Sequence, residues 1–115
     1  MKGNWYLPND TDAYSLTAQT AIQTGTIKPM NHCRQVGWFT EYTGTPSDGT
    51  IIIEWSEQSG YAGTWNQLAE IDCANLVAGT DGAGTYPGPI GFVRARISDT
   101  VVGGTVSVRF NGELN

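Results

Sequence analysis

The chain has 115 residues, of which 15% are charged, and six Lys+Arg against eleven Asp+Glu give a net charge of −5. This length fits one domain that buries a core without metal or disulfide staples. The acidic balance argues against a nucleic-acid partner, because neutralising phosphates needs clustered cations. No apolar run is long enough to span a bilayer, so no membrane association is expected.

Residues 1–12 lack apolar alternation and carry an apolar cluster, Trp5, Tyr6 and Leu7, ahead of turn-forming residues. We interpret this segment as an N-terminal arm, followed by a single domain over residues 13–115. Tyrosine and tryptophan are frequent contact residues at interfaces, so we take Trp5, Tyr6 and Leu7 as candidate partner-binding residues.

The start of the chain has no basic region followed by an apolar stretch, so no secretory signal is predicted. We therefore expect synthesis in a reducing cytosol, where Cys33 and Cys73 are free thiols that behave as small apolar residues. Together with His32, the single histidine, they leave a zinc site one ligand short. The sequence predicts neither a metal nor another cofactor.

Alternating apolar and polar residues predict strands through the first half of the chain. Residues 14–27 read as one or two strands, and residues 35–42 as a strand with large apolar groups on both faces. Residues 43–49 have the Pro and Asp-Gly chemistry of a loop. Residues 50–57 are then predicted to form another strand.

The middle of the chain is less regular. Residues 64–72 predict a strand with a bulge near Asn66-Gln67, because the step from Trp65 to Leu68 breaks strict alternation. A helix over residues 65–74 is the competing interpretation. Residues 75–89 predict a long loop that is too glycine-rich to hold a helix.

The last third contains two alternating runs, residues 92–98 and 105–111, on either side of Gly103-Gly104. They predict an antiparallel hairpin with one buried face. The predicted buried side chains are those of Val93, Ala95, Ile97, Val106, Val108 and Phe110. The strands sum to an all-β antiparallel β-sandwich or jelly roll of about seven to eight short strands.

Three of the six cations, Arg94, Arg96 and Arg109, share the polar face of this predicted hairpin. An arginine row can clamp carboxylates of a partner through bidentate hydrogen bonds. The same arginines could instead pair within the chain with glutamates on neighbouring strands. The available glutamates are Glu41, Glu54 and Glu57.

Four Trp and five Tyr are more than one small core requires. Trp38 and Trp55 lie on well-patterned strands and are expected in the core. Tyr61, Trp65 and Tyr86 lie beside loops, where an aromatic ring anchors the loop, contacts a protein or stacks on a sugar. With one histidine and no Gly-x-Ser-x-Gly motif, no catalytic residues are predicted.

The order of residues 51–56, 63–65, 68–72, 92–97 and 104–108 resembles the small β-sandwich domains of tailed-bacteriophage virion proteins, over about residues 49–112. The resemblance implies a non-enzymatic, usually oligomeric structural protein. We expect a capsid decoration or cement protein at the virion surface, a trimer or dimer that binds the major capsid protein. A carbohydrate-binding module or fibre domain is the alternative.

Overall fold

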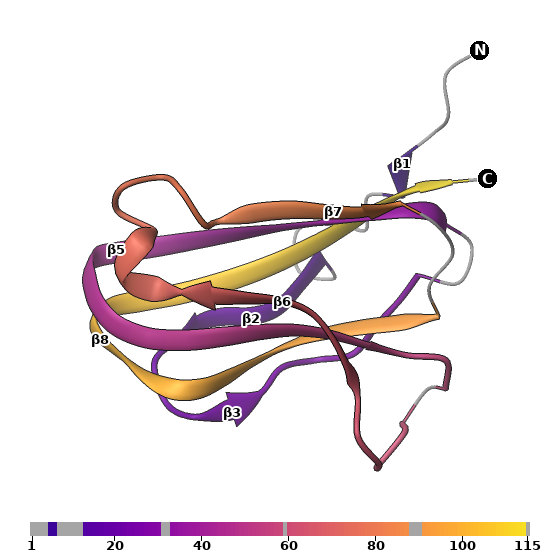
Figure 1. The fold of residues 1–115 in the computed structure, drawn as a ribbon, viewed down its shortest axis with the longest axis horizontal. Coiled ribbons are helices and arrows are strands. Elements are labelled where there is room, and N and C mark those ends of the chain that lie inside the picture. The colour runs from indigo at the N-terminus through magenta and orange to yellow at the C-terminus, as the bar shows by residue number, and fades with distance from the viewer. Residues whose placement is uncertain (1–4, 7–12, 31–32, 59, 88–90, 115) are drawn as a thin grey trace.

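The computed structural model describes residues 5–6, 13–30, 33–58, 60–87 and 91–114 (Figure 1). These residues form one antiparallel sheet system and a single 3₁₀ turn, η1 (Cys73–Asn75). None of their helical segments is long and apolar enough to cross a membrane. The strands are β1 (Trp5–Tyr6), β2 (Tyr14–Gln19), β3 (Gln23–Thr24), β4 (Lys28–Pro29), β5 (Cys33–Ser56), β6 (Asn66–Asp72), β7 (Ala83–Pro87) and β8 (Phe92–Leu114).

Two long strands organise the fold. β5 has 24 residues and β8 has 23, and they pair with each other along nearly their whole length. The resulting ribbon bends over on itself, so that its two halves face each other (Figure 1). This bend turns one hydrogen-bonded sheet into a two-layered sandwich.

The upper layer contains residues 33–44 of β5 and 104–114 of β8, flanked by β7 on one side and by β2 and β1 on the other. The lower layer contains the other halves of β5 and β8, flanked by β6 on one side and by β3 and β4 on the other. The all-β sandwich predicted from the sequence is confirmed, although two of its strands are long.

The core lies between the two layers and is one continuous apolar cluster. The alternation predicted for β8 is confirmed, because every residue expected to face the core is at most 1% exposed. Trp38 is buried, and Trp55 packs against the cluster while remaining partly exposed. The six β8 residues that were predicted to face the core are Val93, Ala95, Ile97, Val106, Val108 and Phe110.

The predicted hairpin between residues 92–98 and 105–111 is wrong, and so is the predicted loop over residues 43–49. Both runs of β8 pair with β5, and both strands continue through the bend. Positive φ angles at Gly44 (71°), Gly49 (124°) and Gly103 (93°) let the paired strands turn the corner together. The turn residues therefore mark one shared corner.

The predicted loop over residues 75–89 is also wrong in part, because it contains β7. Residues 66–72 form a strand, and the helix alternative over residues 65–74 is not observed beyond the short turn η1. The expected bulge is present, since pairing passes from Ile53–Ala69 to Glu54–Gln67 and leaves Leu68 without a partner across the ladder.

One side of the sandwich is tied shut between β2 and the lower layer. The Ser15 hydroxyl donates to the Thr26 carbonyl (2.7 Å) and accepts from the Ala95 amide (3.0 Å). Gly25 donates from its amide to the Ala95 carbonyl (2.8 Å). A Cβ at Gly25 would lie 2.4 Å from the Ser15 carbonyl oxygen, so this close approach of backbones requires glycine.

Candidate functional site

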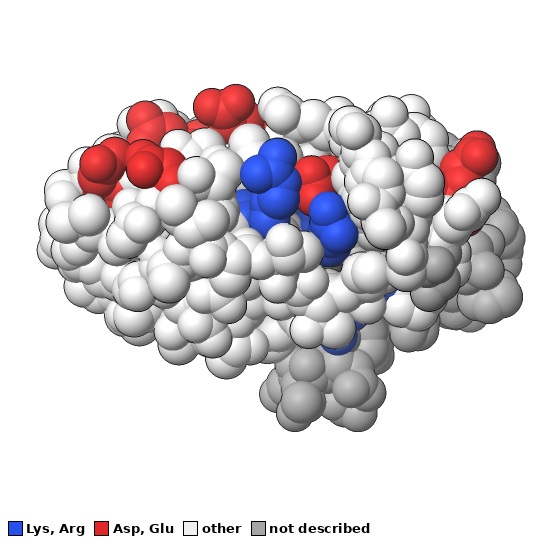
Figure 2. Space-filling model, turned by 90° about the horizontal axis from the view of Figure 1, so that it is seen from below, with Lys and Arg blue, Asp and Glu red and all other residues white. Residues whose placement is uncertain are grey.

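A buried carboxylate holds two of the predicted arginines on the outer face of the lower layer. Glu54 accepts from Arg94 Nε at 2.6 Å and from Arg96 Nε at 3.0 Å. The Glu54 side chain is 4% exposed, whereas those of Arg94 and Arg96 are 18% and 39% exposed. Figure 2 shows this side of the molecule, with blue side chains beside a red one in the middle of a mostly uncharged surface.

Trp65 completes this cluster. The guanidinium carbon of Arg94 lies 4.0 Å from the Trp65 ring centroid, a cation–π geometry. The indole Nε1 donates to the Tyr61 carbonyl (2.9 Å), and Trp65 is 6% exposed. Its burial favours the interpretation of Trp65 as the anchor of the β5–β6 loop.

Arg109 lies on the outer face of the upper layer in a second, more open cluster. Its Nε is 3.8 Å from Glu41 Oε2, and its guanidinium carbon is 5.3 Å from the Phe39 ring centroid. The Tyr14 hydroxyl donates to Glu41 Oε1 at 2.6 Å. The side chains of Arg109 and Glu41 are 46% and 40% exposed, so water screens this ion pair.

The three arginines therefore do not share one face of the molecule, contrary to the sequence prediction. They do lie on the same side of strand β8, but the bend sends Arg94 and Arg96 to one outer face and Arg109 to the opposite one. All three pair with glutamates on β5, as the intramolecular alternative predicted.

An apolar groove of about 330 Å³ lies between β5 and the chain that leads into β7. Three of its lining side chains are large, apolar and exposed: Phe39, Tyr42 and Val77. Leu76 and Ala83 also line it. The groove was not predicted from sequence, because its two exposed aromatic residues, Phe39 and Tyr42, lie on a strand that also contributes to the core.

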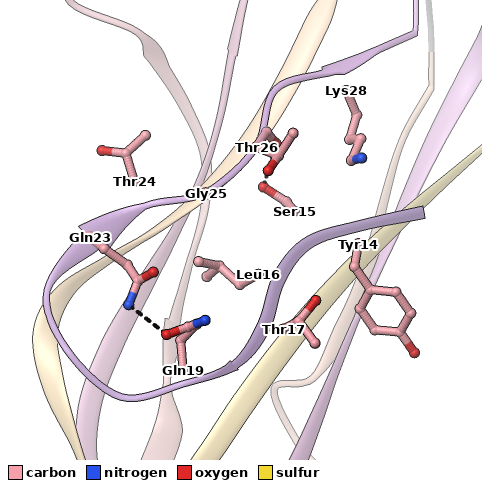
Figure 3. A pocket seen from close by; sticks show the side chains of 10 residues that line it. All are labelled: Tyr14, Ser15, Leu16, Thr17, Gln19, Gln23, Thr24, Gly25, Thr26 and Lys28. Atoms are coloured by element: carbon pink, nitrogen blue, oxygen red, sulfur yellow. Dashed lines mark hydrogen bonds between the residues drawn. The ribbon is translucent and has the colours of Figure 1, made fainter. Parts of the chain in front are cut away.

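A second hollow, of about 420 Å³, lies between β2 and β3 (Figure 3). Hydroxyl and amide groups dominate its lining, and Gln23 Nε2 donates to Gln19 Oε1 at 3.1 Å. Ser15 points toward Thr26, so its hydroxyl is already engaged in closing the sandwich. Lys28 also lines this hollow, so its groups suit polar or anionic ligands.

A third hollow, of about 510 Å³, adjoins the β5–β6 loop and is lined by Tyr61, Trp55, Gln58 and Asn66 among others. Tyr61 is exposed, and of the three aromatic residues predicted as glycan contacts it is the one that lines this hollow. Tyr86 is also exposed, but it lies on β7, directly opposite Val36 in the ladder. Tyr61 and Tyr86 thus belong to different layers.

Of the predicted arm contacts, Trp5 and Tyr6 belong to β1 and pair with Glu113 and Gly112 of β8. This pairing attaches β1 to the upper layer. Leu7 lies outside the described residues.

Cys33 and Cys73 are both free and buried, as predicted. Burial raises the pKa of the Cys33 thiol. Burial, followed by the nearby charges of four aspartates, raises the pKa of Cys73 to about 11. Among the described residues no group of His, Cys, Asp and Glu is arranged to hold a metal ion. The four aspartates are Asp72, Asp48, Asp81 and Asp99.

No family model and no curated protein sequence matches this chain. Solved structures do match its fold. The SPBc2 prophage-derived protein YomS superposes with a TM-score of 0.60 at 13% identity, covering 86% of this chain and 88% of YomS. A chain of the acidic stable capsid structure of Helicobacter pylori bacteriophage KHP30 superposes with a TM-score of 0.57 at 14% identity.

The KHP30 match covers 99% of this chain and 90% of the capsid chain. A chain of an expanded equine rhinitis A virus particle, a picornavirus capsid, has a TM-score of 0.57 at 8% identity, covering 99% of this chain and 73% of that one. At these identities the likeness concerns the fold. The chain therefore has the β-sandwich fold found in phage-derived and viral capsid structures, as its resemblance to virion β-sandwich domains implied.

Proposed function

We propose that this chain is a non-enzymatic structural protein of a phage virion, and that it decorates the capsid surface as a cement protein. The observation that supports this most is the match to a phage capsid chain, which extends over 99% of this chain and 90% of the other. The likeness thus involves the whole sandwich and not one generic hairpin.

The proposed mechanism is stabilisation by mass action. A subunit made in the host cytoplasm binds across neighbouring copies of the major capsid protein after these have assembled. A ligand that binds the assembled lattice and not its separated subunits shifts the equilibrium toward the lattice. Many copies per shell would then resist the pressure of packaged DNA.

Of the three arginines predicted to bind a partner, Arg96 and Arg109 are the more accessible. Both remain substantially exposed while they pair with glutamates, so each guanidinium can also face a carboxylate of a neighbouring virion protein, Arg96 from the lower layer and Arg109 from the upper one. Arg94 is less suitable, because Glu54 and the Trp65 ring enclose it. We also propose that Trp5, Tyr6 and Leu7 contact a neighbouring virion protein.

Co-sedimentation of the purified protein with emptied and DNA-filled heads of the phage that encodes it tests this function. Saturable, stoichiometric binding is expected, and heads that carry the protein should survive heating better than bare heads. Deletion of residues 1–12 should leave a folded domain with reduced occupancy. If the intact chain shows no saturable binding to either kind of head, the cement role is wrong.

A glycan-binding fibre or module is the second candidate, because Tyr61 is exposed at the rim of a hollow of about 510 Å³ with amide groups nearby. Sugar rings stack on exposed aromatic faces and bond to such amides. Binding on a glycan array that Tyr61→Ala abolishes, in a variant that still folds, would favour this candidate over the capsid role.

A further inference from the structure

The sides of a sandwich are where its sheets can accept further strands, and they are unevenly protected here. An edge strand presents unpaired N–H and C=O groups, and proteins normally blunt such edges with charges, bulges or covering segments. In the described part of the chain, β6 is one edge and carries Glu70, Asp72 and the bulge at Leu68. On the opposite side, β2 shifts register twice and Ser15 ties it to Ala95.

Among the described residues, β7 has no charge, no bulge and no further strand paired along its outer edge, and only Pro87 at its end blunts it. Its five residues, Ala-Gly-Thr-Tyr-Pro, include no charged side chain, and they pair with β5 through five consecutive partners without a register shift. Within the described residues β7 pairs with β5 alone. It is therefore a regular, uncharged strand whose outer edge is left unpaired by every other described strand.

The direction of the free backbone groups follows from one hydrogen bond. The Thr40 amide donates to the Gly82 carbonyl at 2.6 Å, so Gly82 faces β5. Backbone groups alternate in direction along an antiparallel strand, so Gly84 and Tyr86 also face β5. The backbone groups that point outward are therefore those of Ala83, Thr85 and Pro87. Pro87 has no N–H, and its pairing with β5 needs none at this outward-facing position.

We propose that β7 pairs with β7 of a second copy of this chain, antiparallel across a twofold axis at Thr85. The two Thr85 residues would exchange two backbone hydrogen bonds. The Ala83 amide of each copy would donate to the Pro87 carbonyl of the other. The two upper layers would then form one continuous sheet, with the same surface used by both partners.

Charge favours a second copy at this edge. The chain carries −5, so two copies approach each other most easily along a strip without acidic residues. Asp81 lies outside β7, in the bend that precedes it, and its Oδ2 accepts from the Asp72 amide at 2.8 Å. Across the twofold axis the two Asp81 residues would therefore lie at opposite ends of the paired strands, outside the uncharged strip.

Apolar exposure points to the same side. Of the seven large apolar side chains exposed in the described residues, four lie on β7 or in the groove that begins beside it. A standard interface removes about 800 Å² from each partner, roughly one eighth of the 6152 Å² surface of this chain. The four side chains are Phe39, Tyr42, Val77 and Tyr86.

Sedimentation equilibrium of the full chain, from low micromolar to near-millimolar concentration, tests the proposal directly. The expected result is a concentration-dependent shift from 12.4 kDa toward twice that mass. Thr85→Pro should give a monomer that stays folded by circular dichroism, since the Thr85 amide faces outward. A wild-type chain that remains monomeric, or a Thr85→Pro variant that still dimerises, would overturn the proposal.

A charge exchange at Thr85 tests the register. Thr85 is exposed, and the twofold axis places it opposite its own counterpart. Thr85→Lys and Thr85→Glu should each raise the dimer Kd about fivefold or more through like-charge repulsion, whereas an equimolar mixture of the two should recover dimers. A mixture that associates no better than either variant would refute the twofold pairing. Capsid heads take no part in these measurements, so their outcome is independent of the proposed function.

Discussion

The carboxylate of Glu54 provides a sharp test of what holds the lower layer together. Replacing it by glutamine keeps the shape of the side chain but removes the charge that two arginines share. Arg94 would then remain mostly buried against Trp65 without a counterion. Removing one partner of a buried ion pair costs about 3–5 kcal/mol. Because Arg96 is partly hydrated, we expect Glu54→Gln to lose about 3 kcal/mol of unfolding free energy.

The upper layer supplies the matched control. Glu41→Gln removes the same charge from an ion pair with Arg109 that is longer, at 3.8 Å, and exposed on both sides. Exposed ion pairs contribute about 0–1 kcal/mol, and the glutamine oxygen can still accept from the Tyr14 hydroxyl. We therefore expect Glu41→Gln to cost about 0.5 kcal/mol at most.

Urea unfolding followed by tryptophan fluorescence measures both changes. At roughly 4 °C per kcal/mol for a domain of this size, Glu54→Gln should also lower Tm by about 12 °C. If the two variants lose similar stability, or if Glu54→Gln costs less than about 1 kcal/mol, the buried pair is not what stabilises this face.

Three further predictions concern the core and the tied side of the sandwich. Thr40 Oγ1 is buried and has no hydrogen-bond partner among the described residues, so Thr40→Val should raise the unfolding free energy by about 1 kcal/mol in urea titrations. Gly25→Ala should cost about 2 kcal/mol or more because its Cβ would meet two backbone oxygens, whereas Gly82→Ala, with ordinary contact distances, should cost little in the same assay. Cys73 in the unfolded chain ionises near pH 9 but keeps its proton to about pH 11 when folded, so the unfolding free energy should fall by about 1.4 kcal/mol per pH unit between those values. Cys73→Val should flatten that slope, and unchanged slopes would contradict the assignment.

The alternation of β8 was predictable from sequence because it depends on neighbouring residues along one strand. The strand with which β8 pairs was not predictable, because the same apolar face can be buried in a core next to several different partner strands. Gly103-Gly104 is equally compatible with a tight reversal and with a corner. Only the matching glycines of β5, Gly44 and Gly49, reveal that both strands bend at the same point.

The two arginine–glutamate clusters were likewise predictable only in part. The pairing of Arg94 and Arg96 with Glu54 was among the interpretations open from sequence, because opposite charges on adjacent strands attract. The separation of Arg109 from them depended on the corner and was therefore missed. β7 was missed for a different reason, since a five-residue strand with one glycine and one proline is hard to distinguish from a loop.

The two-layered arrangement assigns different surfaces to the two proposed associations. Pairing through β7 extends the upper layer sideways and leaves the outer face of the lower layer, with Arg96, available in both copies. A dimer built in this way could lie on a shell with its lower faces while its upper sheet remains continuous. Arg96→Ala should therefore weaken binding to heads without changing the dimer Kd, and Thr85→Lys should weaken the dimer while single copies still bind. Variants that change both properties together would show that one surface serves both.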